Sequence, residues 1–321
     1  MGGTEKYPHA AVRCQRHMAA ADAPGARSVL ARPICLALPV WGTLLAWSGA
    51  TGAEPVPLTQ DGQLKFAPVV LRDGQEIVYS VQTGPALKSL MRLRVAERSV
   101  EPLHPAAKTS EFEAAFSPDG RYCAFVQSQG NLNLKLIIRD TLEKRDAVYD
   151  PGGGFAGMHN PVFLPAESRI LFSMAEGGTQ HIFSVNYEGK DRRLVVRGGF
   201  NLWPAVSPDG RRLAFGSARD GNFEIYTARL DGSDLKRLTH DGAFDGRPAW
   251  SPDGKRIAFV SLRDGNYELY LMDADGTHVR RLTHHPERDD YPCWHPDGKH
   301  LVFVGERAGR FDLYLLALEP P

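Results

Sequence analysis

Hydrophobic and polar residues alternate along most of the chain after residue 54, and short turn sequences interrupt this alternation at regular intervals. The stretch from Arg247 to His284 contains four alternating segments that are separated by glycine-containing turns. A period of two over four short segments predicts a four-stranded antiparallel meander. One such sheet cannot bury both of its faces, so we expect several copies to stack against one another.

The turn sequence Ser-Pro-Asp-Gly, or a variant of it, occurs six times. Its second position falls at residues 72, 118, 165, 208, 252 and 296, so the copies are 46, 47, 43, 44 and 44 residues apart. Proline presets φ at the second position of such a turn, and glycine closes the turn. A period of about 40–45 residues with four strands in each unit is typical of the blades of a β-propeller.

The last unit ends at Pro321, just after its third apolar segment, and so lacks a fourth strand. The segment Val56–Thr59 carries the same Leu-Thr ending as the fourth strands of two other units. An N-terminal strand that pairs there removes an open sheet edge. We therefore predict an all-β fold over residues 54–321: a six-bladed propeller of four-stranded antiparallel blades, with the last blade closed by the N-terminal strand.

The repeated pattern Pro-x-Trp-Ser-Pro-Asp-Gly, followed by Asp-Gly-Asn-x-Glu-Leu-Tyr and Arg-Arg-Leu-Thr, resembles the blades of the TolB-type propeller family and the WD-like repeats of peptidase propellers. The resemblance is strong in units four to six, moderate in unit two and weak in units one and three. It implies an exported scaffold that binds proteins. TolB proteins have an α/β domain before the propeller, for which we expect no room here, so partner recognition through that domain is not carried over.

Residues 1–53 differ from the rest of the chain. Two arginines precede an apolar run, Ile34–Trp47, and small residues follow it. This order is typical of a secretory signal peptide cleaved after Ala50 or Ala53. The run is shorter than the roughly 20 residues of a membrane-spanning helix. The interpretation predicts a periplasmic or secreted protein; an uncleaved anchor, a disordered tail and a true start at Met18 are the alternatives.

Formal net charge is zero, with 38 basic and 38 acidic residues, which argues against a nucleic-acid partner. The motifs of hydrolases, P-loop proteins, dinucleotide-binding proteins and zinc peptidases are absent, so we expect no catalytic activity. Cys123 and Cys293 lie in non-adjacent units and are expected to be buried free thiols. We also expect a monomer.

The loops that lead into the first strand of each unit, called the leading loops below, carry the candidate ligand-binding residues. In a propeller the first strands line the central channel. Oxygen ligands that face one channel could hold Ca²⁺. The alternative is a water-filled funnel in which Lys65 balances the charge of the acidic residues. Four residues before the second turn position lies a further repeated proline site, which is proline at 68, 161, 204, 248 and 292 and Ala114 in unit two. The position three residues before this site holds Lys65, Glu111, Met158, Asn201, Asp245 and Asp289, of which Glu111, Asn201, Asp245 and Asp289 are the predicted ligands.

Aromatic and histidine side chains in the same loops are typical of protein interfaces, although some could pack between blades instead. We predict a protein-binding scaffold of the cell envelope that uses the face bearing the leading loops and needs no cofactor. One alternative is a metal-dependent polysaccharide lyase that uses His159, His240 and His284. Another is a carbohydrate-binding propeller. The predicted partner-binding residues are Phe155, His159, Phe200, Trp203, Phe244, His284, His285 and Tyr291.

Overall fold

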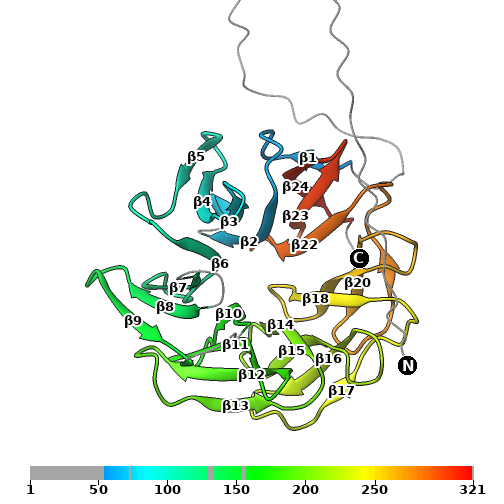
Figure 1. The fold of residues 1–321 in the computed structure, drawn as a ribbon. Helices are drawn as coiled ribbons and strands as arrows, with labels where there is room; N and C mark the ends of the chain where they lie inside the picture. Colours follow the sequence, from blue (N-terminus) through cyan, green and yellow to red (C-terminus); the bar gives the residue numbers. More distant parts are fainter. Residues whose placement is uncertain (1–53, 72–73, 129–132, 153–156, 320–321) are drawn as a thin grey trace, which may run out of the picture. The chain divides into compact units, whose positions relative to one another are not determined.

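A computed structural model of the chain describes residues 54–71, 74–128, 133–152 and 157–319. The regular elements that it describes are 24 β-strands, and they form six separate four-stranded antiparallel sheets. Figure 1 shows these sheets arranged around a common centre, with the first strand of each sheet innermost. The predicted all-β, six-bladed propeller is confirmed.

Each blade is built from strands in chain order, from the channel outward. Blades one to three are β2 (Lys65–Leu71), β3 (Glu76–Gln82), β4 (Lys88–Arg94) and β5 (Ser99–Pro102); β6 (Ser110–Phe116), β7 (Tyr122–Ser128), β8 (Leu134–Asp140) and β9 (Arg145–Tyr149); and β10 (His159–Phe163), β11 (Arg169–Glu176), β12 (Thr179–Asn186) and β13 (Arg193–Val196).

Blades four to six follow the same order, except that the outermost strand of blade six comes from the start of the chain. They are β14 (Asn201–Val206), β15 (Arg212–Ser217), β16 (Glu224–Arg229) and β17 (Lys236–Arg237); β18 (Asp245–Trp250), β19 (Arg256–Ser261), β20 (Glu268–Asp273) and β21 (Arg280–Arg281); and β22 (Asp289–Trp294), β23 (His300–Arg307), β24 (Arg310–Ala317) and β1 (Val56–Pro57).

The core lies between neighbouring blades, where large and small side chains meet. The central phenylalanine of the second strand is fully buried in five blades. The large residue that ends the first strand reaches the blade before it: the indole Nε1 of Trp250 donates to the carbonyl of Ala205 at 3.2 Å, and that of Trp294 to Ala249 at 3.0 Å. These tryptophans therefore make contacts between blades.

The Ser-Pro-Asp-Gly turns share one hydrogen-bond pattern. In blade five, the Ser251 hydroxyl donates to Asp253 Oδ1 at 2.6 Å and accepts from the backbone N–H of Arg256 at 2.9 Å. The turns of blades two and four repeat both bonds. Gly254 closes the turn at φ 69°, a conformation that favours glycine. Blade six has histidine at the serine position.

The ring is closed by the N-terminal segment, as the sequence predicts. Val56 pairs with Leu315 and Pro57 with Tyr314, so β1 is the outer strand of blade six. The Thr59 hydroxyl donates to Asp312 Oδ1 at 2.8 Å and accepts from the backbone N–H of Leu313 at 3.0 Å. Thr239 and Thr283 make the equivalent bonds to buried glutamates inside blades four and five.

The predicted signal peptide and the boundary after residue 53 concern residues outside the described part of the chain. Within that part, no helix has the length and apolar character that crossing a membrane requires. Cys123 and Cys293 are free thiols, as expected; Cys123 is buried, whereas Cys293 is only partly buried. Burial raises the pKa of Cys123 to about 12 and that of Cys293 to about 11, so both thiols stay protonated at neutral pH.

Replacement of Thr59 by valine should destabilise the propeller, because the buried Asp312 carboxylate then loses a donor at the ring closure. Loss of one partner of a buried polar group costs about 1–3 kcal/mol. Urea unfolding followed by circular dichroism measures the change. Thr141→Val is the matched control, since the Thr141 hydroxyl donates at an exposed site to the Arg121 carbonyl. Equal losses in the two variants would contradict a special role for the closure.

Candidate functional site: the central channel

A bulge interrupts the first strand of every blade at the same place. Pairing with the second strand shifts register there, and one non-glycine residue adopts a φ between 49° and 56°. A bulge changes the direction of a side chain, and positive φ at a non-glycine residue carries strain. The six residues at this position, which we call the bulge residues, are Ala67, Glu113, Asn160, Trp203, Arg247 and Tyr291.

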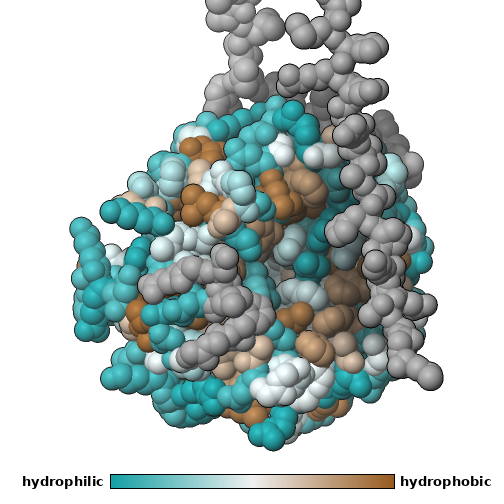
Figure 2. Space-filling model, viewed as in Figure 1, coloured by the Kyte–Doolittle hydropathy of each residue, from teal (hydrophilic) through white to brown (hydrophobic). Residues whose placement is uncertain are grey.

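All six bulge residues line one cavity of about 590 Å³ in the central channel. The lining continues along the first strands to the prolines of the hairpin turns, including Pro208, Pro252 and Pro296. Among the described residues that were predicted for the leading loops, Trp203 and Tyr291 line it, and both lie within first strands; Phe200, Phe244, His284 and His285 do not line it. The cavity therefore opens toward the face that carries the Pro-Asp-Gly turns, which we call the turn face. Figure 2 shows hydrophobic residues near the centre of one face and also at its edge, among residues that are mostly hydrophilic.

The Arg247 side chain lies between two aromatic rings of the channel wall. Its guanidinium carbon is 4.3 Å from the ring centroid of Tyr291 and 4.9 Å from that of Trp203. Nη1 lies 3.3 Å from Asp290 Oδ1, and Nη2 donates to the Tyr291 hydroxyl at 3.3 Å. Nε is buried without a hydrogen-bond partner among the described residues. The wall thus holds a cation stacked on aromatic faces, with one donor still unused.

An acidic group occupies the opposite side of the channel, since blades two and five face each other in a six-bladed ring. Glu113 Oε2 accepts from the backbone N–H of Asn160 at 2.7 Å and lies 3.3 Å from His159 Nδ1. Burial alone would raise the pKa of Glu113, but the charge and hydrogen bonds of His159 and Asn160 lower it. Burial would likewise lower the pKa of His159, and Glu113 raises it instead.

The predicted cation ligands of the leading loops have other partners. Asp245 Oδ2 accepts from Arg263 Nη2 at 2.8 Å, and Asp289 Oδ1 accepts from Arg307 Nη1 at 2.7 Å. Burial nevertheless raises the pKa of both aspartates above the ordinary value. Arg307 ends the second strand of blade six and Arg263 follows that of blade five, so each pair joins the first strand to the end of the second.

Asn201 and Glu111 are also held within their own blades. Asn201 Oδ1 accepts from the Ser217 hydroxyl at 2.8 Å, and Glu111 Oε2 lies 2.5 Å from His104 Nδ1. Lys65 bonds to Asp312 at the ring closure instead of balancing acids in the channel. Within the described residues, these carboxylates do not assemble into a set of three ligands. Channel Ca²⁺ stays a prediction without a built site.

The structure separates the predicted partner-binding residues into distinct places. Trp203 and Tyr291 line the channel cavity, and His159 pairs with Glu113 beside it. Phe244 packs between Trp203 and Tyr267, with ring centroids 5.7 and 5.9 Å away. Phe200 is half exposed, at 50%. Phe155 lies outside the described residues.

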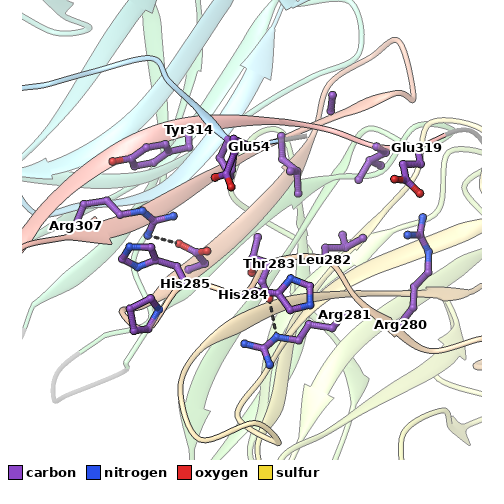
Figure 3. A pocket seen from close by; sticks show the side chains of 16 residues that line it. Glu54, Arg280, Arg281, Leu282, Thr283, His284, His285, Arg307, Tyr314 and Glu319 are labelled. Carbon is purple, nitrogen blue, oxygen red and sulfur yellow. Dashed lines mark hydrogen bonds and ion pairs between the residues drawn. The ribbon is translucent and has the colours of Figure 1, made fainter. Parts of the chain in front are cut away.

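His284 and His285 line a different hollow, a groove of about 620 Å³ between blades five and six (Figure 3). Figure 3 shows Arg281 and Arg307 reaching into the same groove. Both arginines are already bonded: Arg281 Nη2 donates to the buried Glu268 at 2.8 Å, and Arg307 holds Asp289. These two arginines thus serve ion pairs within blades five and six, and the channel is the better candidate site.

The sequence analysis missed three bulge residues that carry polar groups, Glu113, Asn160 and Arg247. A signal for them exists. Each bulge residue immediately precedes the repeated proline site, and its identity changes from blade to blade. A variable position next to a repeated one would have identified the channel lining.

A family model described as the TolB beta propeller domain matches residues 112–247 and 243–320, which is well over half of the chain. The chain belongs to the TolB β-propeller domain family. The predicted resemblance is therefore confirmed.

Two curated relatives of this propeller illustrate how far the similarity extends. An uncharacterized protein of Agrobacterium fabrum is 31% identical over 166 residues, which cover 50% of this chain and 54% of the relative. The Tol-Pal system protein TolB of Syntrophus aciditrophicus is 35% identical over 77 residues, 22% of this chain and 17% of the relative. The chain spans about half or less of the length of these curated relatives.

Solved structures show the same architecture. A protein provisionally assigned as TolB from Agrobacterium tumefaciens has a TM-score of 0.63 and 26% identity, with 73% of this chain and 86% of that chain covered. An oligogalacturonate lyase in complex with manganese has a TM-score of 0.57 at 17% identity, with 82% and 79% covered. At that identity the lyase shares the fold alone.

The His159–Glu113 pair should make the stability of this propeller pH-dependent. The raised pKa of His159 means that the pair contributes fully below about pH 6.5, the ordinary value for histidine, and that this contribution is lost as the pH rises through the higher folded-state value. The melting temperature should fall between pH 6 and pH 9, and His159→Gln should flatten that fall. The same change at the exposed His240 is the control; equal slopes in the wild type and His159→Gln would contradict the pairing.

Proposed function

We propose that this TolB-family propeller is an exported, non-catalytic binding protein of the cell envelope that takes a segment of a protein partner into its channel cavity from the turn face. The observation that carries the proposal is the cavity itself, which joins apolar walls to a few polar groups at the bulge. Ligand sites are typically concave, mostly apolar and of about 300–1,000 Å³, and 590 Å³ is within that range.

The residue types of the cavity support a protein partner. Trp250 and Trp294 line it near the turns, while Trp203, Tyr291 and Arg247 line it at the bulge. Tryptophan, tyrosine and arginine are the residues that most often dominate protein-binding energy. Arg247 and Glu113 lie on opposite walls, so one side of the cavity carries a basic group and the other an acidic group. A bound segment would therefore have one preferred orientation, with an acidic or carbonyl group toward Arg247.

The envelope location rests on two supports. The predicted signal peptide precedes the propeller, and relatives carry names such as Tol-Pal system protein TolB. The leading-loop face stays the alternative docking surface, because Phe200 is exposed there. The same experiment can separate the two faces.

Cross-linking of the purified protein in an envelope extract, followed by mass spectrometry, should identify a partner whose recovery depends on the cavity. We expect Arg247→Gln to reduce recovery of that partner on the order of tenfold, the effect of losing a binding hot spot. Arg145→Gln is the matched control, since Arg145 is 73% exposed on the outer strand β9. Circular dichroism should show that both variants are folded, with a somewhat lower melting temperature for Arg247→Gln, which also loses the ion pair with Asp290.

Loss with Phe200→Ala, and not with Arg247→Gln, would move the site to the leading-loop face. Recovery unchanged in both variants would contradict partner binding through either face.

The enzymatic alternative receives no comparable support. The predicted metal-holding histidines, His159, His240 and His284, do not form a ligand group among the described residues. His159 is already bonded to Glu113, and His284 lies in the groove between blades. The carbohydrate alternative would use the same aromatic lining as the protein segment, so glycan binding by the wild type but not Arg247→Gln would favour it.

A further inference from the structure

The hairpin turn of blade six departs from the serine turns of blades two, four and five. Blade six carries His295-Pro-Asp-Gly-Lys-His300, where blade five carries Ser251-Pro-Asp-Gly-Lys-Arg256. In the serine turns the hydroxyl donates to the aspartate at 2.5–2.6 Å. In blade six this donor is missing, and two imidazoles face the carboxylate of Asp297 instead.

The two histidines converge on one carboxylate oxygen. Asp297 Oδ2 lies 3.1 Å from His295 Nδ1 and 2.7 Å from His300 Nδ1. The three potential ligand atoms all lie within 4.8 Å of one another, and no other group of three histidine, cysteine or acidic side chains among the described residues meets this condition. The two imidazole rings stand edge to face, with centroids 5.9 Å apart.

We propose that His295, Asp297 and His300 form a binding site for a divalent late transition-metal ion, of which Zn²⁺ is the type. Bonds of about 2.1 Å in a tetrahedral site place ligand atoms about 3.4 Å apart, which the observed spacing reaches with small side-chain shifts. Imidazole nitrogens combined with one carboxylate suit zinc, nickel and copper better than calcium or magnesium.

The surroundings of the turn hold its ligands in place. Asp297 Oδ1 accepts from the backbone N–H groups of Lys299 at 2.8 Å and His300 at 3.2 Å, which leaves Oδ2 for the ion. The backbone N–H of Asp297 donates to His295 Nδ1 over 3.3 Å, a long bond that the ion would replace. All three side chains are between 22% and 35% exposed, so a fourth position is open to water.

The site lies at the junction that closes the ring. A Cβ atom added to Gly74 of blade one would stand 1.6 Å from His295 Nε2, so the imidazole lies directly against the backbone of that blade. An ion that fixes His295 on blade six would therefore also order the contact with blade one. Because only the native state assembles the site, binding should stabilise the folded propeller.

The test uses untagged protein, stripped with a chelator and titrated with Zn²⁺ in a calorimeter. We expect one bound equivalent for the wild type and its loss in the double variant His295→Ser, His300→Arg, which rebuilds the turn sequence of blade five. Added Zn²⁺ should raise the melting temperature of the wild type and leave that of the double variant unchanged.

A matched control separates this site from general binding of metal by surface histidines. His278→Ser removes an exposed histidine that pairs with Asp273 at 2.7 Å outside the site, and it should keep the bound equivalent. Full Zn²⁺ binding by the double variant, or equal losses in the control, would overturn the proposal. So would the absence of any bound equivalent in the wild type. The result does not depend on a protein partner, so the two proposals fail separately.

Discussion

The closure of the ring at Asp312 is the interaction on which the rest of the propeller depends. This carboxylate accepts from Thr59, which follows the outer strand β1, and from Lys65 at the start of β2. It therefore joins the beginning of the chain, blade six and blade one in one buried contact. The two-residue pairing of β1 with β24 and the apolar cluster that blades one and six share complete the closure and leave no open edge there. The channel and its bulge residues exist only in the closed ring.

The side chains of the repeated sequence signature make contacts within and between blades. Glu268, for example, is fully buried and accepts hydrogen bonds from Thr283, Arg281 and Asn266 of the same repeat. A buried charge that is fully hydrogen-bonded is tolerated, whereas one without partners is costly. Such residues are fixed by packing. Positions that the signature does not specify are free to vary with function. The bulge residues are the main group of such positions.

The direction of the acidic side chains in the leading loops does not follow from the alternation of the sequence. Alternation suggests that Asp245 faces the channel, and the structure pairs it with Arg263 inside its blade. The reason is the bulge between Gly246 and Ala249, which breaks the period of two on which the prediction relied. Arg247, at positive φ within that bulge, lines the channel in its place. Trp203 and Tyr291, which stand out in the sequence as aromatic side chains, also line the channel cavity, and their role in partner binding stays a prediction.

The sequence by itself determined the blade count, the strand order within a blade and the closure by the N-terminal strand. These follow from turn chemistry and alternation, which are local and repeat every 43–47 residues. Only the tertiary structure decided which side chains meet across the channel, as with Arg247 between Trp203 and Tyr291. It also decided that His295 and His300 converge on Asp297. Such contacts depend on the angle between blades and on the direction that each bulge or turn gives a side chain, and a linear pattern encodes neither.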